Sequence, residues 1–163
     1  LMFSMTQYTN LSARTTADTF FPDRVLPSWL IGRLSEFVSI SDRIDKAKKA
    51  LFYGKPTDKV PSNPDQEPYH FHPDVIHSIL GIATEAAELV QLLLNPPKDF
   101  RLKVVDEGGD LLWYVALLFR HFGISFEEAA LKNIEKLKAR YPDGFNSSAA
   151  IHRDEDKELA AIQ

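Results

Sequence analysis

Two long apolar stretches, each with helical spacing, constrain the fold of this chain more than any other feature. The first covers 75–94, where apolar side chains occupy nearly every side of a helix. A helix of that kind must be buried on most of its surface. The second stretch covers 99–122 and stops at Gly123, a residue favoured just beyond a helix end. We therefore predict two core helices, over 74–94 and 99–122.

A third core helix is predicted directly after them. Ser125 is placed to cap it, and Glu128 follows three residues later in the pattern of a capping box. This helix should reach Arg140 or Tyr141, because Pro-Asp-Gly follows. The connections between the three helices are only a few residues long, which favours antiparallel neighbours in a bundle. No segment alternates as a strand does, so we predict an all-α helical bundle.

The remaining segments are predicted to belong to the same single domain, 1–163, around a motif core at 74–145. A short helix is expected over 5–16. Ser28 should cap a helix that begins at Trp29 and ends near Tyr53, as one helix or as two with a break near 39–41. Segment 54–73 contains five prolines and is predicted to be a loop. The polar tail 146–163 should hold one short helix, over 154–162.

Composition excludes several classes of function. The chain has 163 residues, a net charge of −4 and no cysteine, so disulfides, zinc fingers and thiol catalysis are excluded. An acidic chain has no general attraction to nucleic acid or to anionic lipid. The longest apolar run covers only 111–119, which is too short to span a bilayer. We expect a cytoplasmic protein without nucleic-acid or membrane partners.

Four carboxylates lie at helical spacing within the two apolar helices. Glu85 and Glu88 form one pair, and Glu107 and Asp110 form the other. Positions three apart lie about 60° apart on one helix face, so each pair points in one direction. In an antiparallel hairpin the two pairs can meet around one point. Such pairs are also common on solvated helix faces, and that is the competing interpretation.

The apolar surroundings favour a metal site over a solvated face. Glu85 and Glu88 are the only acidic residues between Val75 and Leu94. Carboxylates are costly to bury unless a proton, a base or a metal neutralises them. Lys103 is the one base near Glu107 on its helix, too few for four acids. An all-oxygen site suits Mg²⁺, with Mn²⁺ as the alternative. Magnesium held this way usually completes its shell with water and phosphate, which indicates phosphoanhydride or phosphate-ester chemistry.

Asn133, Lys136 and Arg140 recur at three- and four-residue steps on the third helix. They form a stripe that could clamp phosphate groups. The alternative is an ordinary solvated face, because other charged residues alternate with them.

These motifs resemble the MazG-like all-α nucleoside triphosphate pyrophosphohydrolases. The resemblance rests on Glu85-x-x-Glu88, a spacer of 18 residues, Glu107-x-x-Asp110, and a later helix with Asn133 and Lys136 that ends in Arg-Tyr-Pro-Asp-Gly-Phe. It covers about 74–154. The long N-terminal region and the Pro-rich segment depart from the short family pattern.

The resemblance implies hydrolysis of a nucleoside triphosphate between its α and β phosphates. It implies Mg²⁺ on Glu85, Glu88, Glu107 and Asp110, with Glu85 or Glu88 activating the attacking water. Asn133, Lys136 and Arg140 become phosphate contacts, and Tyr114 matches an aromatic position near the nucleotide. Purine deoxynucleotides (dGTP or dATP) are the expected substrates, and a homodimer or homotetramer is the expected assembly.

Three other functions compete with this one. The first is hydrolysis of pyrimidine or non-standard deoxynucleotides. The second is a helical oligomer that binds nucleotides without catalysis. The third is an oxidative di-metal carboxylate bundle, which needs Glu-x-x-His pairs on helices. Glu67-x-x-His70 has that spacing, but Pro68 lies within it and no second copy follows.

Overall fold

The computed structural model describes residues 3–55, 57–63, 65, 67 and 69–163, and these contain helices and turns but no strand. The all-α prediction is therefore confirmed for the described residues. The chain divides into two compact units, 23–122 and 1–22 with 123–163. The α-helices are α1 (Met5–Ser12), α2 (Pro27–Tyr53), α3 (Pro73–Leu94), α4 (Phe100–Phe122), α5 (Phe126–Arg140), α6 (Ser147–Ile151) and α7 (Glu155–Ala160). Two 3₁₀ turns, at Ala13–Thr15 and Pro22–Arg24, complete the described elements.

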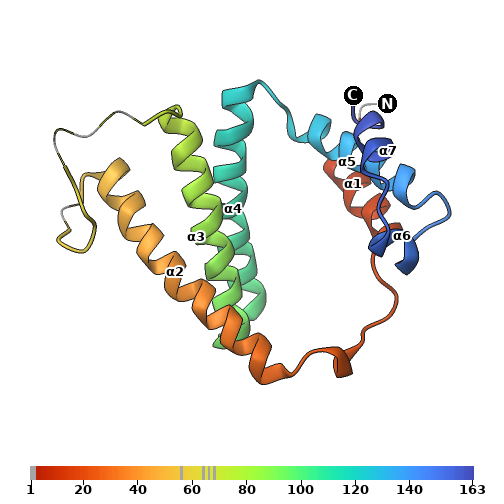
Figure 1. The fold of residues 1–163 in the computed structure, drawn as a ribbon, viewed down its shortest axis with the longest axis horizontal. Helices are drawn as coiled ribbons and strands as arrows, with labels where there is room; N and C mark the ends of the chain where they lie inside the picture. The colour runs from red at the N-terminus through yellow and green to blue at the C-terminus, as the bar shows by residue number, and fades with distance from the viewer. Residues whose placement is uncertain (1–2, 56, 64, 66, 68) are drawn as a thin grey trace. The chain divides into compact units, whose positions relative to one another are not determined.

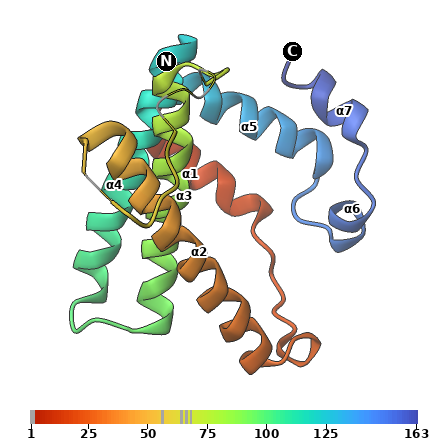
Figure 2. The same ribbon diagram turned by 60° about the vertical axis from the view of Figure 1, so that its left-hand side comes forward.

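The unit 23–122 is built from α2, α3 and α4. Helix α3 is central and packs against both of the others, and Figure 1 shows α3 and α4 side by side. Figure 2 shows the short connection that makes these two helices antiparallel neighbours, as predicted. The third helix of this unit is α2, not the helix after Ser125. The predicted packing of the helix after Ser125 against the other two core helices stays a prediction.

The ends of these helices follow local signals. Gly54 and Gly123 adopt left-handed φ values of 62° and 68°, where a side chain would be strained. Asp99 caps α4 by accepting the Leu102 amide at 2.9 Å. The predicted cap at Ser28 was wrong: α2 begins at Pro27, whose fixed φ and missing N–H suit a first helical turn. From there α2 runs unbroken to Tyr53.

Helices α3 and α4 approach closely at Gly81. A Cβ at this position would lie 2.1 Å from Cδ1 of Tyr114, so only a glycine fits beside the ring. Tyr114 is buried at this contact, and only 6% of its surface is exposed. The contact fixes the ring of Tyr114 one turn after Asp110, on the same helix.

The other unit contains α1, α5, α6 and α7. Helix α5 packs against α1 and α7, and it is capped as predicted, by Ser125 accepting the Glu128 amide at 3.0 Å. The tail contains one helix more than predicted, α6, which Asn146 caps. The single-domain prediction for 1–163 stays a prediction.

Helix α3 has the length and the mean hydropathy, 1.3, of a membrane-crossing helix. The central helix of a soluble protein passes the same test. Here α3 is the helix between α2 and α4, and 33% of its most apolar stretch is buried.

Candidate functional site

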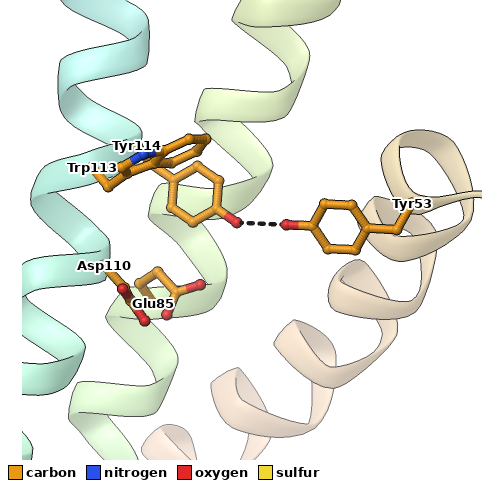
Figure 3. Close-up of a pocket in the computed structure, with 5 residues that line it drawn as sticks. All are labelled: Tyr53, Glu85, Asp110, Trp113 and Tyr114. Carbon is orange, nitrogen blue, oxygen red and sulfur yellow. Dashed lines mark hydrogen bonds between the residues drawn. The ribbon is translucent and has the colours of Figure 1, made fainter.

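Three of the four predicted carboxylates meet between α3 and α4. Ligand oxygens of Glu85, Glu107 and Asp110 all lie within 4.8 Å of one another. Figure 3 shows the carboxylates of Glu85 and Asp110 turned toward each other. Glu85 is 6% exposed and Glu107 9%, whereas Asp110 is exposed to solvent. The convergence of the two acid pairs in the hairpin therefore holds for these three residues.

Glu88, the fourth predicted carboxylate, lies beside this group and is more exposed. Desolvation, a hydrogen bond with Glu107 and the charge of Glu85 raise the pKa of Glu88 to about 7. Two carboxylates that share a hydrogen bond cannot both be ionised easily. Glu88 therefore holds a proton near neutral pH, and a divalent cation would take that proton's place.

The structure adds a residue that the sequence did not single out, Lys48 of α2. Its ammonium Nζ donates to Thr84 Oγ1 at 2.8 Å and to Glu85 Oε1 at 3.3 Å. It lies 3.3 Å from Asp45 Oδ1 and 4.9 Å from the centre of the Tyr114 ring. Spacing along 74–94 and 99–122 indicated Lys103 as the nearby base, and the structure supplies a second one, Lys48, from a different helix.

A signal for Lys48 does exist in the sequence, although it is weak. Lys48 follows Ile44 by four residues and precedes Leu51 by three, so it interrupts a helical pattern of apolar positions. It is also 37 positions away from Glu85. Periodicity cannot say which distant helix such a lysine will meet.

Lys103 contacts the acid group from its solvent side. Its Nζ lies 2.6 Å from Asp106 Oδ2 and 3.4 Å from Glu107 Oε1. About half of the Lys103 side chain is exposed, so the ion pair is screened by water and contributes little to stability. The strongly buried cation of this site is Lys48.

An aromatic wall adjoins the acids. A pocket of about 330 Å³ is lined by Glu85 and Asp110 on one side and by Tyr53, Trp113 and Tyr114 on the other. The hydroxyl groups of Tyr53 and Tyr114 are 3.2 Å apart (Figure 3). Burial and this hydrogen bond raise the pKa of Tyr114 to about 12. The tyrosine is therefore neutral at physiological pH and keeps a hydroxyl that can donate.

His77 lies behind this wall. Its ring stacks on Phe52 with centroids 4.1 Å apart and meets Trp113 and Tyr114 edge to face. Burial and the Lys48 charge lower the pKa of His77, so the imidazole is neutral. Its Nε2 is buried without a hydrogen-bond partner among the described residues. These contacts make His77 a packing residue behind the pocket.

The predicted phosphate contacts lie on α5, in the other unit. Asn133 Oδ1 accepts from the Tyr8 hydroxyl at 3.3 Å. Arg140 donates from Nε to Glu158 Oε1 at 2.7 Å and pairs with the second oxygen as well. The pair raises the pKa of Arg140 and lowers that of Glu158 to about 2. Lys136 lies between Asn133 and Arg140 along the helix and is partly exposed.

A second group of metal-type donors involves His72, Asp74 and His121, at the start of α3 and the end of α4. All three are exposed. Nδ1 of His72 accepts the Asp74 amide at 3.1 Å, which makes this histidine the N-cap of α3. Capping therefore accounts for His72.

The acid group has the chemistry of a hard-cation site. Its donors are carboxylate oxygens alone, which suit Mg²⁺ or Mn²⁺ rather than softer metals. The raised pKa of Glu88 is a sign of excess negative charge that a divalent cation would relieve. The residues present therefore fit the predicted ion.

Comparison with known proteins supports the resemblance. Residues 76–145 match the family model of the MazG nucleotide pyrophosphohydrolase domain. Glu85, Glu88, Glu107 and Asp110, together with Asn133, Lys136 and Arg140, all fall inside this segment. No curated protein matches the chain, and no solved structure does.

Proposed function

Residues 76–145 belong to the MazG nucleotide pyrophosphohydrolase domain family, and on that premise we propose that this protein is a Mg²⁺-dependent nucleoside triphosphate pyrophosphohydrolase. It would cleave a substrate into a nucleoside monophosphate and pyrophosphate. One observation supports this most directly. The pocket that contains Glu85 and Asp110 is closed on its other side by aromatic rings, so one cavity offers both a cation site and a stacking surface.

Glu85, Glu88, Glu107 and Asp110 would hold the cation. A bound Mg²⁺ offsets the charge of the phosphates and makes a water molecule a better nucleophile. Carboxylates from two packed helices hold such a site more precisely than a loop would. Mn²⁺ has the same donor preference and should substitute for it.

Glu88 or Glu85 would take the proton of the attacking water. A general base must hold no proton when the water attacks, and a bound cation would keep Glu88 ionised by lowering its pKa from about 7. Glu85 has one carboxylate oxygen engaged with Lys48, so it is suited to orienting the water. The two residues divide these roles in our proposal, with Glu88 as the base.

The aromatic wall would receive the base of the nucleotide. Trp113 is about half exposed beside the pocket, whereas Tyr114 is buried and can offer only its ring edge and hydroxyl. Stacking on an exposed ring is worth about 1–3 kcal/mol per base and increases with the area of the base. This favours a purine, so we propose dGTP or dATP as substrates.

Asn133, Lys136 and Arg140 would contact the phosphates from α5. Arg140 now binds the carboxylate of Glu158 through two of its nitrogens, and a guanidinium binds phosphate in the same two-pronged way. A phosphate can therefore bind Arg140 in this way only if it displaces the Glu158 carboxylate from the guanidinium. Lys136 can act as a point charge without such an exchange.

The decisive experiment is a screen of all common ribo- and deoxynucleoside triphosphates with Mg²⁺ and identification of the products. We expect the monophosphate and pyrophosphate, with the fastest turnover for a purine deoxynucleotide. Release of inorganic phosphate with a diphosphate, or no turnover of any nucleotide, would contradict the proposal. Fastest turnover of a pyrimidine or a non-standard deoxynucleotide would support the alternative substrate class instead.

The Glu88→Gln variant tests the role of the acid group. It should lose turnover by about 100-fold or more, because both the proton acceptor and one metal ligand are removed. The helical circular dichroism signal should stay unchanged. Glu36→Gln is a matched control, because Glu36 is an exposed glutamate on α2 that pairs with Arg33 across one helical turn. Tight nucleotide binding by the wild-type protein without hydrolysis would favour a non-catalytic function.

The remaining expectations are also proposals. We propose a homodimer or homotetramer in the cytoplasm, in which nucleoside triphosphates are available. The acidic net charge of −4 supports the absence of nucleic-acid partners. Iron content and visible absorption after aerobic purification would separate this enzyme from an oxidative di-metal bundle.

A further inference from the structure

The environment of Lys48 is unusual for a lysine. The residue is 3% exposed, although lysines are almost never fully buried unless they are paired. Its ammonium is paired with two carboxylates, because Nζ lies 3.3 Å from Asp45 Oδ1 and 3.3 Å from Glu85 Oε1. The site therefore keeps a fixed ammonium group beside the acids that would bind the metal.

The hydrogen bonds around Lys48 converge on one oxygen of Glu85. Lys48 Nζ lies 3.3 Å from Glu85 Oε1, and Thr84 Oγ1 lies 3.4 Å from the same atom. Thr84 is itself held in place, because its hydroxyl accepts from Lys48 at 2.8 Å and donates to the Gly81 carbonyl at 3.0 Å. The described hydrogen bonds of the Glu85 carboxylate thus fall on Oε1, and Oε2 remains for a cation.

We propose that Lys48, braced by Thr84, is a positioning residue that restricts Glu85 to binding a metal through one oxygen and so sets the preference of the site for small cations. This inference rests on the metal site of the proposed function. A cation that tried to use both oxygens of Glu85 would have to approach the Lys48 ammonium as well. Like charges repel strongly where little water is present, so that approach is excluded.

One-oxygen binding discriminates between divalent ions by size. Mg²⁺ requires six ligands in octahedral order at about 2.1 Å and is usually bound by carboxylates through single oxygens. Ca²⁺ takes six to eight oxygens at longer distances and gains from carboxylates that bind through both. A Glu85 with one oxygen held by Lys48 therefore suits Mg²⁺ and penalises Ca²⁺.

The test is calorimetric titration of the whole protein with Mg²⁺ and with Ca²⁺, without nucleotide, in the wild type and in Lys48→Met. Removing a group that orients a metal ligand changes metal affinity about 10- to 100-fold. We expect Lys48→Met to bind Mg²⁺ about tenfold more weakly relative to Ca²⁺ than the wild type does. An unchanged ratio of the two affinities in a folded Lys48→Met variant would overturn the inference.

Lys49→Met is the matched control. Lys49 is the next residue and also pairs with Asp45, but its side chain is 42% exposed and the pair lies within one turn of α2. Its removal changes the local charge by the same amount. We therefore expect the Mg²⁺ to Ca²⁺ ratio of Lys49→Met to equal that of the wild type. An equal shift in both variants would show a general charge effect and overturn the positioning role.

Thr84→Val provides a second variant that keeps the lysine. Valine has nearly the shape of threonine but cannot accept the Lys48 hydrogen bond, so the ammonium loses its brace. We expect the ratio of the Mg²⁺ and Ca²⁺ affinities to shift in the same direction as in Lys48→Met. An unchanged ratio in Thr84→Val would overturn the inference, even if Lys48→Met fails to fold. Wild-type protein that binds neither ion would overturn the metal site itself. Wild-type protein that binds Mg²⁺ without hydrolysing nucleotides would leave this inference standing while the proposed activity fails.

Discussion

At the scale of single residues, the most informative feature of this protein is a small set of charged side chains in apolar surroundings. Glu85 is buried among apolar residues of α3 and is neutralised in part by Lys48 at 3.3 Å. Among the described residues Glu88 has no such ammonium partner, and it shares a hydrogen bond with Glu107 that helps to raise its pKa. One glutamate of the pair is therefore oriented by a lysine, and the other is partly protonated near pH 7. A repeated Glu-x-x-Glu spacing does not reveal this difference.

The raised pKa of Glu88 predicts proton release when the metal binds. With a pKa of about 7 in the ion-free protein, Glu88 is about half protonated at pH 7, and a bound cation requires the ionised form. We expect about half a proton released per Mg²⁺ at pH 7 and almost none at pH 9. Calorimetry in two buffers of different ionisation enthalpy measures this number. Glu88→Gln should release no proton at pH 7, and equal release by that variant would contradict the assignment.

The same shift sets the sign of a stability change with pH. Because the pKa of Glu88 is raised from 4.5 to about 7 in the folded state, the native protein binds more protons than the unfolded chain between these values. This contribution to stability is present at pH 4.5 and is lost as the pH rises through 7. The metal-free protein should therefore lose stability over that range, relative to Glu88→Gln, in urea denaturation at several pH values.

At the scale of elements, the contact between α3 and α4 is what brings the two acid pairs together. Each pair is placed on its own helix by local spacing, but their meeting depends on how closely the helices pack. Gly81 allows that approach, because Tyr114 occupies the space that a Cβ would need. The residue that orders the site is thus a glycine one turn before Glu85.

Gly81→Ala should disrupt this contact. The added Cβ would lie 2.1 Å from the Tyr114 ring, so either the helices separate or the ring moves. Overpacking of this kind typically costs about 1–3 kcal/mol, and metal affinity should fall with it because Asp110 shifts relative to Glu85. Urea denaturation and Mg²⁺ titration measure the two effects.

Gly32→Ala is the matched control for this prediction. Gly32 lies inside α2, and a Cβ there would meet nothing within 4 Å. Alanine is a better helix former than glycine by about 1 kcal/mol, so this variant should be as stable as the wild type or more so. A Gly81→Ala protein as stable as Gly32→Ala would contradict the close packing of α3 on α4.

At the scale of the whole molecule, exposed apolar residues on α4 indicate where another copy of the chain would bind. Val105 and Leu112 are 58% and 54% exposed. They are seven residues apart, so they lie on nearly the same side of the helix. Apolar residues at this spacing are typical of helix-to-helix contacts between chains. We therefore place a contact of the proposed homo-oligomer on this side of α4.

Glutamate at both positions should dissociate the oligomer. Val105→Glu with Leu112→Glu would put two charges into the contact, where they could not be solvated. Light scattering after size exclusion should give the mass of a monomer, 18.5 kDa, with the helical signal retained. Leu159→Glu is the control, because Leu159 is also 54% exposed but lies on α7. A loss of the oligomer in this control alone would place the contact elsewhere.

The sequence by itself determined the helices and the order of the acids. Apolar periodicity predicted α3 and α4 nearly to their ends, because the helix ends carry local signals such as Pro73, Gly123 and the prolines after Asn95. The spacing of Glu85, Glu88, Glu107 and Asp110 fixed which side chains share a helix face. These are local properties, since they depend on residues a few positions apart.

Only the tertiary structure decided which helix completes the core and which cation lies beside the acids. Lys48 and Glu85 are 37 positions apart, and nothing in either local pattern specifies their meeting. The choice of α2 as the third helix next to α3 depends on which apolar surfaces fit together, as does the fit of Tyr114 over Gly81. Packing depends on the surfaces of all segments of the chain together, and no short stretch of sequence contains that information.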